Sequence, residues 1–260
     1  MNNKIKIKDA FFNKKAFIAY LMAGDPNLGA SADYILTAQE AGAGMVEIGI
    51  PFSDPIAEGE VIQAASMRAL AAGTRLDGVF SMVASIKEKM KIPMVFMTYL
   101  NPVFAYGYGR FFARCEKIGI CGVIIPDLPF EEQEEAKCEA GKYGVEVVTL
   151  VAPTSGKRIA QIAKNAEGFI YLVSSMGTTG VRSKVSADIS DIVSEIRKHT
   201  DIPVAVGFGI STPEQAREVA QFADGVIVGS AIVRIIAAHG RHCIEPVQQF
   251  AKSIKAACRH

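Results

Sequence analysis

The sequence predicts an α/β protein whose strands close into a (β/α)₈ barrel, the TIM-barrel architecture. Eight short apolar segments recur along the 260 residues, and segments with helical periodicity lie between them. Strands that are apolar along most of their length and each precede a helix are typical of a parallel sheet covered by helices. We expect one barrel domain over residues 1–260. The alternative is a doubly wound open sheet, but no Gly-x-Gly-x-x-Gly motif follows the first segment to support its dinucleotide-binding form.

The predicted elements follow one another in a regular order. Residues 1–15 form an amphipathic lead-in rich in lysine, which predicts an extra N-terminal helix. The predicted strands are residues 16–21, 45–48, 93–97, 122–125, 146–151, 169–173, 203–206 and 225–228. Helical periodicity marks residues 30–41, 61–72, 77–90, 131–143, 159–166, 189–199 and 213–220. The connection from residue 49 to residue 92 is long enough for an extra helix in that βα loop.

Composition excludes several classes of protein. Half of the residues are hydrophobic and 21% are charged, which is too apolar for a disordered chain. The net charge of +1 and the lack of a basic cluster argue against nucleic acid as a partner. No apolar run reaches membrane-spanning length, and the polar start favours a cytoplasmic protein. Five cysteines without a Cys-x-x-Cys pair fit reduced thiols, and the pair His239 and His242 lacks a third ligand, so we expect no metal site.

A carboxylate within the second apolar segment is the first candidate for catalysis. Glu47 interrupts the apolar run Met45–Ile48, and a loop stiffened by two prolines follows, carrying Asp54 and Glu58. An acid in an apolar strand beside an acidic loop is a common way to present a general acid or base. The same pattern fits a salt-bridged core residue next to an ordinary turn.

Glycine-rich turns after the last three predicted strands indicate a phosphate site. They are Gly177–Gly180, Gly207–Ser211 and Gly229–Val233. Glycine lets backbone N–H groups approach an anion, and the helix that starts near Ser230 adds the positive end of its dipole. In barrels, the loops after strands seven and eight often bind phosphate in this way. The polar, glycine-containing loop 174–185 is a candidate lid.

The expected substrate is therefore a phosphorylated small molecule. No predicted strand ends in lysine, as an imine-forming aldolase would require, and the clustered ligands of a metal-dependent aldolase are missing. Acid–base catalysis by carboxylates remains, on a substrate that supplies its own electron sink. Tyr171 fits an ordinary core aromatic residue, whereas Phe208 would be exposed unless a flat apolar ligand covers it.

These motifs resemble those of the tryptophan synthase α subunit family. The resemblance rests on Glu47-Ile-Gly-Ile-Pro-Phe-Ser-Asp-Pro55, Asn101-Pro102, Pro126-Asp127-Leu-Pro129, Gly177-Thr-Thr-Gly180, Gly207-Phe-Gly-Ile-Ser211 and Gly229-Ser-Ala-Ile-Val233. The family implies a barrel lyase that cleaves indole-3-glycerol phosphate into indole and glyceraldehyde 3-phosphate, the α reaction of L-tryptophan biosynthesis. It implies no cofactor in this chain. It also implies a β-subunit partner that carries pyridoxal phosphate and receives indole within an α₂β₂ complex.

The resemblance further implies two catalytic acids, three substrate-binding residues and four phosphate-binding residues. These are Glu47 and Glu58; Tyr171, Thr179 and Phe208; and Gly180, Gly209, Gly229 and Ser230. Protonation of the ring carbon that carries the glycerol chain would make indole the electron sink. Glu47 is expected to give that proton and to take one from the adjacent hydroxyl, while Glu58 accepts a hydrogen bond from the ring N–H.

Three residues depart from the family pattern. Glu58 is one methylene longer than the usual aspartate, Glu60 stands where proline is common, and Ser175 replaces a lid arginine. Two other readings stay open: a sugar-phosphate isomerase or epimerase on the same fold, and a weakly active or regulatory α subunit that mainly activates its β partner.

Overall fold

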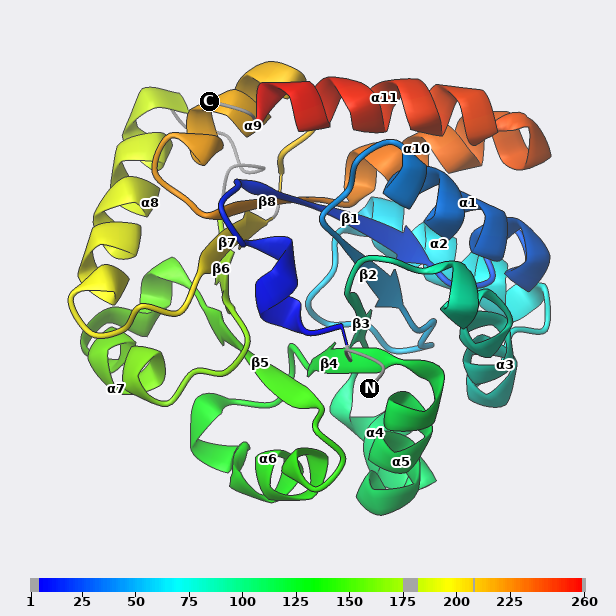
Figure 1. Ribbon diagram of the computed structural model, residues 1–260, viewed down its shortest axis with the longest axis horizontal. Coiled ribbons are helices and arrows are strands. Elements are labelled where there is room, and N and C mark those ends of the chain that lie inside the picture. The colour runs from blue at the N-terminus through cyan, green and yellow to red at the C-terminus, as the bar shows by residue number, and fades with distance from the viewer. Residues whose placement is uncertain (1–4, 175–181, 208, 259–260) are drawn as a thin grey trace.

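Eight parallel strands close into a barrel in chain order, and β1 completes it by pairing with β8 (Figure 1). The structure is a computed structural model that describes residues 5–174, 182–207 and 209–258. The strands are β1 (Ala16–Met22), β2 (Met45–Gly49), β3 (Met94–Met97), β4 (Ile120–Ile124), β5 (Glu146–Val151), β6 (Ile170–Val173), β7 (Val204–Gly207) and β8 (Gly225–Val228). The predicted (β/α)₈ barrel is confirmed, and each predicted strand lies within two residues of the observed one.

Helices surround the barrel and cover the outer faces of the strands (Figure 1). They are α1 (Leu28–Glu40), α2 (Glu60–Ala71), α3 (Leu76–Ile86), α4 (Leu100–Tyr106), α5 (Tyr108–Ile118), α6 (Glu134–Gly141), α7 (Ile159–Lys164), α8 (Arg182–Arg197), α9 (Pro213–Ala220), α10 (Ser230–His239) and α11 (Ile244–Ala257). Short 3₁₀ turns are η1 (Ile7–Ala10), η2 (Lys87–Lys89), η3 (Phe130–Glu132), η4 (Pro153–Arg158) and η5 (Gly240–His242). The extra helix expected between β2 and β3 is present, since that connection holds both α2 and α3.

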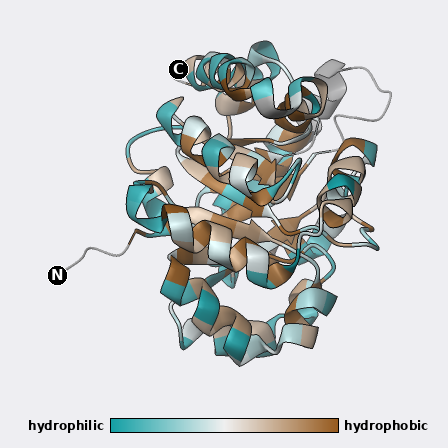
Figure 2. Ribbon diagram, turned by 90° about the vertical axis from the view of Figure 1, so that its right-hand side faces the viewer, coloured by the Kyte–Doolittle hydropathy of each residue, from teal (hydrophilic) through white to brown (hydrophobic). Residues whose placement is uncertain are grey.

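The core has two layers because side chains along each strand alternate between the barrel interior and the helices. In β1, Ile18 and Tyr20 belong to the inner cluster, whereas Phe17 and Leu21 pack in the outer one. Figure 2 shows the apolar residues concentrated in the strands and on the helix sides that face them. Among the described residues, no helix is long and apolar enough to cross a membrane.

The N-terminal end of the barrel is closed by η1, which lies across it in Figure 1. The predicted extra helix is thus a single 3₁₀ turn. Ile7 and Ala10 are fully buried within the inner cluster. The side chain of Ile7 reaches the backbone of β4, where a Cβ on Gly122 would overlap it. With this end filled, the opposite end of the barrel is left for a site.

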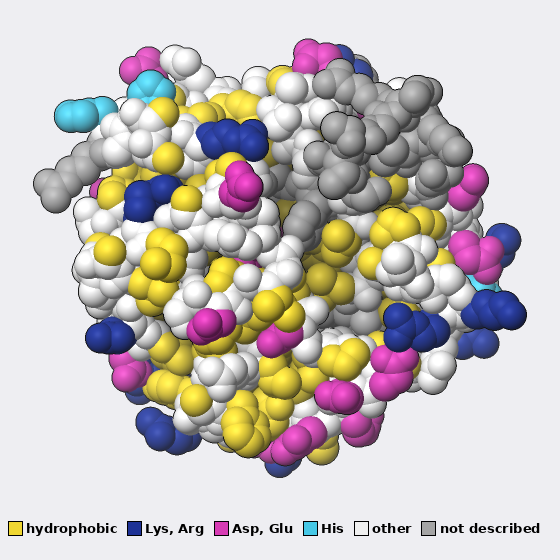
Figure 3. Space-filling view, turned by 180° about the vertical axis from the view of Figure 1, so that it is seen from behind, with side chains coloured by type: hydrophobic (Ala, Val, Ile, Leu, Met, Phe, Trp, Pro, Cys, Tyr) yellow, Lys and Arg dark blue, Asp and Glu magenta, His cyan; other side chains and the backbone are white. Residues whose placement is uncertain are grey.

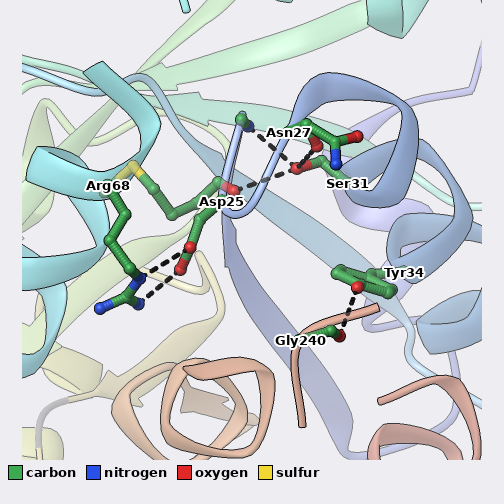
Figure 4. Close-up of polar contacts among 8 residues, drawn as sticks. Asp25, Asn27, Ser31, Tyr34, Arg68 and Gly240 are labelled. Atoms are coloured by element: carbon green, nitrogen blue, oxygen red, sulfur yellow. Dashed lines mark hydrogen bonds and ion pairs between the residues drawn. The ribbon is translucent and has the colours of Figure 1, made fainter. Parts of the chain in front are cut away.

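An ion pair joins the loop after β1 to α2 (Figure 4). Nε and Nη2 of Arg68 donate to the two carboxylate oxygens of Asp25 at 2.9 and 2.7 Å, and Asp25 is only 2% exposed. On the same loop, Asn27 caps α1 by accepting a hydrogen bond from the N–H of Ala30 at 2.9 Å. Because α2 begins two residues after Glu58, the pair anchors the helix that follows the acidic loop.

Replacing Arg68 tests this anchor. Arg68→Ala should lower the free energy of unfolding by about 2 kcal/mol, because the buried carboxylate of Asp25 loses its bidentate partner. Chemical denaturation would measure the loss. The matched control is Arg75→Ala, an exposed position just before α3, which should change stability by less than about 0.5 kcal/mol. Equal losses in the two variants would show that the ion pair contributes nothing.

Candidate active site

A cavity of about 440 Å³ lies at the C-terminal ends of the strands. Figure 3 views the molecule from this side, opposite to the view that shows η1. The cavity brings together six of the site residues predicted from the sequence: Glu47, Glu58, Tyr171, Gly209, Gly229 and Ser230. The other three, Thr179, Gly180 and Phe208, lie outside the described residues, as does most of the predicted lid.

Glu47 is completely buried on the wall of this cavity. It points inward because it is paired in register with Tyr20 of β1, which belongs to the inner cluster. Neither oxygen of its carboxyl group has a hydrogen-bond partner among the described residues. Burial, and then the negative charge of Glu58, raise the pKa of Glu47 to about 8. The carboxyl group is therefore mostly protonated at neutral pH and can donate a proton.

Glu58 is held by an aromatic pair. The hydroxyl of Tyr99 donates to Oε2 of Glu58 at 2.8 Å and accepts a hydrogen bond from the N–H of Ala57 at 2.9 Å. The ring of Tyr99 stacks on Phe52, with centroids 5.2 Å apart. Burial raises the pKa of Glu58, the bond from Tyr99 lowers it, and the charge of Asp127 raises it. Overall the pKa of Glu58 is raised, so the acidic loop holds in place a carboxyl group that is more basic than usual.

Tyr171 is both a core residue and part of the cavity wall. It is 4% exposed, and a Cβ on Gly207 of the neighbouring strand would overlap its hydroxyl. Glycine at this position therefore makes room for the tyrosine. Burial, and then the charge of Glu47, raise the pKa of Tyr171 well above its ordinary value, so the hydroxyl keeps its proton. The substrate-binding role implied by the family resemblance stays a prediction.

Three of the four predicted phosphate-binding residues, Gly209, Gly229 and Ser230, line the cavity, and Gly180 lies outside the described residues. Gly209 has φ of +79°, a left-handed conformation that favours glycine, and Gly229 and Ser230 stand at the start of α10. The N-terminus of this helix carries unpaired N–H groups and the positive end of the helix dipole. Arg234, one turn further along α10, also lines the cavity and adds a positive charge.

Three residues of this cavity region, Tyr20, Tyr99 and Arg234, were not predicted from the sequence. Tyr20 lies in an apolar strand, where the sequence does not distinguish it from an ordinary aromatic core residue. Tyr99 stands two residues before the motif Asn101-Pro102, which could have marked it. Arg234 lies four residues after Ser230 and so on the same face of α10.

A second cavity, of about 760 Å³, lies beside η1 and is lined by residues that precede β1, β7 and β8 and by residues near the C-terminal ends of α8 and α11. Three of its charged side chains are in internal contacts: Lys15 donates to the carbonyl of Ala223 at 2.7 Å, and Arg197 pairs with Asp224 at 2.9 Å. None of the predicted site residues that the structure describes lines it. Within the described ranges, no three His, Cys, Asp or Glu side chains are grouped so as to hold a metal ion.

Comparison with known proteins gives a consistent result. A family model described as tryptophan synthase alpha chain matches residues 8–259. The chain is 47% identical to the tryptophan synthase alpha chain of Lacticaseibacillus casei over 252 residues, which cover 97% of this chain and 95% of the relative. A solved structure from Aquifex aeolicus VF5 superposes with a TM-score of 0.90 and 39% identity, covering 98% of this chain and 100% of that chain. A chain from the tryptophan synthase α₂β₂ complex of Pyrococcus furiosus superposes with a TM-score of 0.86 and 36% identity, covering 93% and 98%.

The raised pKa of Glu47 has a consequence for stability. Between pH 4.5 and about 8, the folded chain keeps the carboxyl proton of Glu47, whereas the unfolded chain has released it. The contribution of Glu47 to the free energy of unfolding is therefore fully present below pH 4.5. It is lost as the pH rises toward 8, by about 1.4 kcal/mol per pH unit. Glu47→Gln has no such proton. The stability of this variant relative to the natural chain should rise across that window and then level off, as measured by denaturation at several pH values. A difference that is independent of pH would show that Glu47 has an ordinary pKa.

Proposed function

The chain belongs to the tryptophan synthase alpha chain family, and we infer that it catalyses the retro-aldol cleavage of indole-3-glycerol phosphate to indole and glyceraldehyde 3-phosphate. This is the α reaction of L-tryptophan biosynthesis, and the chain is a carbon–carbon lyase. One observation carries the assignment of the site. A fully buried carboxyl group on β2, with no hydrogen-bond partner among the described residues, shares a cavity with Gly209 after β7 and with the helix N-terminus after β8.

We place the phosphate of the substrate at Gly209, Gly229 and Ser230. Backbone N–H groups at the start of α10 would bind it, and Arg234 would attract it electrostatically. The indole ring then lies toward Glu58, against the apolar side chains of Ile62 and Met97 that line the same cavity. A flat apolar ring fits this wall better than a sugar phosphate does, which disfavours the isomerase and epimerase readings. The roles of Thr179, Gly180 and Phe208, which the family resemblance implies, stay predictions.

We assign the proton transfers to Glu47. Its carboxyl group, protonated at neutral pH, gives a proton to the ring carbon that carries the glycerol chain. The resulting carboxylate takes the proton of the adjacent hydroxyl, the C–C bond breaks, and its electrons return to the indole ring. One proton leaves Glu47 and one comes back, so the enzyme ends the cycle as it began. Proton transfers of this kind contribute about 10²–10⁴-fold each.

Glu58 is assigned to the ring N–H, where positive charge develops once the ring carbon is protonated. A carboxylate held in place by Tyr99 would stabilise that charge without moving. Because the ring itself accepts the electrons of the broken bond, the reaction needs no cofactor in this chain. Pyridoxal phosphate is expected only in the β partner.

We propose a β-subunit partner in an α₂β₂ complex. Two large apolar side chains near the cavity end of the barrel are exposed: Ile56 on the acidic loop, at 80%, and Phe104 on α4, at 68%. Figure 3 shows hydrophobic side chains exposed on this face. They would be covered by a partner that receives indole directly. A cytoplasmic location fits the five cysteines, all of which are free thiols.

The test is indole release from indole-3-glycerol phosphate by the purified chain, alone and with a cognate β subunit. We expect slow release alone and a rise of at least about tenfold with the partner, equivalent to roughly 1.4 kcal/mol of barrier. Glu47→Gln should lose at least about a hundredfold in rate in both conditions while still binding glycerol 3-phosphate. No release in either condition would favour the regulatory reading, in which the chain mainly activates its β partner.

The length of the loop acid gives a separate prediction. In the structure Glu58 reaches Tyr99 at 2.8 Å, so the loop backbone already suits a glutamate. Glu58→Asp shortens the side chain by about 1.5 Å and should lower kcat, because misplacement of that order can cost about a hundredfold. Glu58→Ala should lower it further, since no carboxylate remains. Steady-state rates of indole release would rank the variants. A higher kcat for Glu58→Asp would contradict the claim that the loop backbone suits a glutamate at this position.

A further inference from the structure

Tyr20 is a polar residue in the cavity with no assigned role. It lies on β1, is 4% exposed, and lines the cavity together with Glu47 and Gly229. Its hydroxyl has no hydrogen-bond partner among the described residues. An unsatisfied buried hydroxyl costs about 1–3 kcal/mol, whereas phenylalanine would fill the same space without that cost. A ligand that pairs with the hydroxyl would offset this cost.

Two glycines fix the position of the Tyr20 side chain. A Cβ on Gly49 of β2 would overlap the hydroxyl and the end of the ring, and a Cβ on Gly229, just after β8, would lie 3.2 Å from the Cβ of Tyr20. The ring therefore lies across β1 between its two neighbouring strands, in a space that the glycines leave open. The hydroxyl therefore has one fixed position in the cavity.

Tyr20 lies between the two strands that lead to the ends of the proposed substrate, with its hydroxyl beside Gly49 on the β2 side. β1 pairs with β2 on one side, where Glu47 is opposite Tyr20, and with β8 on the other, which leads to Gly229. A substrate with its phosphate at Gly229 and its reacting carbon at Glu47 must pass its glycerol chain over Tyr20. The hydroxyl on the ring-bearing carbon is the one that Glu47 deprotonates. The middle hydroxyl, next to the phosphate-bearing carbon, is the one left to meet Tyr20.

Tyr20 can act only as a donor or acceptor of hydrogen bonds and not as an acid. Burial, and then the charges of Glu58 and Glu47, raise its pKa well above the ordinary value of 10. The hydroxyl thus keeps its proton at any pH at which the enzyme works.

We propose that the hydroxyl of Tyr20 is a specificity-determining group that donates a hydrogen bond to the middle hydroxyl of the glycerol chain. The proposal rests on the proposed function. It predicts that the enzyme distinguishes substrates by this hydroxyl, since a site built to pair with a hydroxyl rejects the analogue that lacks it.

The test pairs Tyr20→Phe with two substrates. One is indole-3-glycerol phosphate, and the other is its analogue without the middle hydroxyl, which keeps the hydroxyl that Glu47 deprotonates and still yields indole. For the natural substrate, Tyr20→Phe should lower kcat/KM on the order of tenfold, the loss expected for one hydrogen bond. For the deoxy analogue, the variant and the natural chain should have equal kcat/KM. Tyr108→Phe, on α5 and away from the cavity, is the matched control and should change neither value.

Other outcomes overturn the proposal in distinguishable ways. Equal losses on both substrates would mean that Tyr20 acts through Glu47, and no loss on either would mean that its hydroxyl touches no substrate. The thermal stability of Tyr20→Phe should equal or exceed that of the natural chain, so a poorly folded variant cannot imitate the expected result. If the natural chain releases no indole from indole-3-glycerol phosphate, the proposed function itself fails.

Discussion

The burial of one carboxyl group in the barrel interior is the constraint on which the site depends. Glu47 has no exposed surface and no hydrogen-bond partner among the described residues, so its charged form is disfavoured. A charge that is costly to bury keeps the group neutral, and a neutral carboxyl group near neutral pH can serve as an acid and then as a base. Burial of this carboxyl group lowers the stability of the fold, but it keeps the proton that catalysis requires. The barrel tolerates it because the two layers of apolar packing around the strands are otherwise continuous.

The groups around Glu47 owe their positions to strand pairing, to glycines and to side-chain contacts with neighbouring elements. Pairing of β1 with β2 sets Tyr20 beside Glu47, and the glycines at 49 and 229 leave room for its ring. Tyr99, just after β3, holds Glu58. The ion pair between Asp25 and Arg68 anchors the helix that follows the acidic loop. Each polar group is thus fixed by an element of the barrel, which is what a preorganised site requires.

Much of this arrangement could be predicted from the sequence. Apolar segments of strand length predicted all eight strands, and the glycine turns after the last strands predicted a phosphate site, which we place at Gly209, Gly229 and Ser230. Glu47 stood out because a carboxylate is rare in such a segment. Tyr20, Tyr99 and Arg234 could not be found in that way, because what matters for them is which neighbours they meet across strands and loops. Periodicity also named no helix for α4, α5, α10 or α11. The seven residues of α4 are too few to show a repeat, whereas α5 buries Phe111, Phe112, Cys115 and Ile118 at helical spacing and could have been found. Three predicted site residues, Thr179, Gly180 and Phe208, lie outside the described residues.

Glu47 is neutral at neutral pH because the barrel buries it. The most direct measurement is a ¹³C NMR titration of the chain labelled at the side-chain carboxyl carbon of glutamate, with the signal of Glu47 identified by its loss in Glu47→Gln. We expect this signal to titrate with a midpoint near 8, well apart from those of exposed glutamates. A midpoint near the ordinary value of 4.5 would contradict it, because Glu47 would then be ionised when the reaction requires its proton.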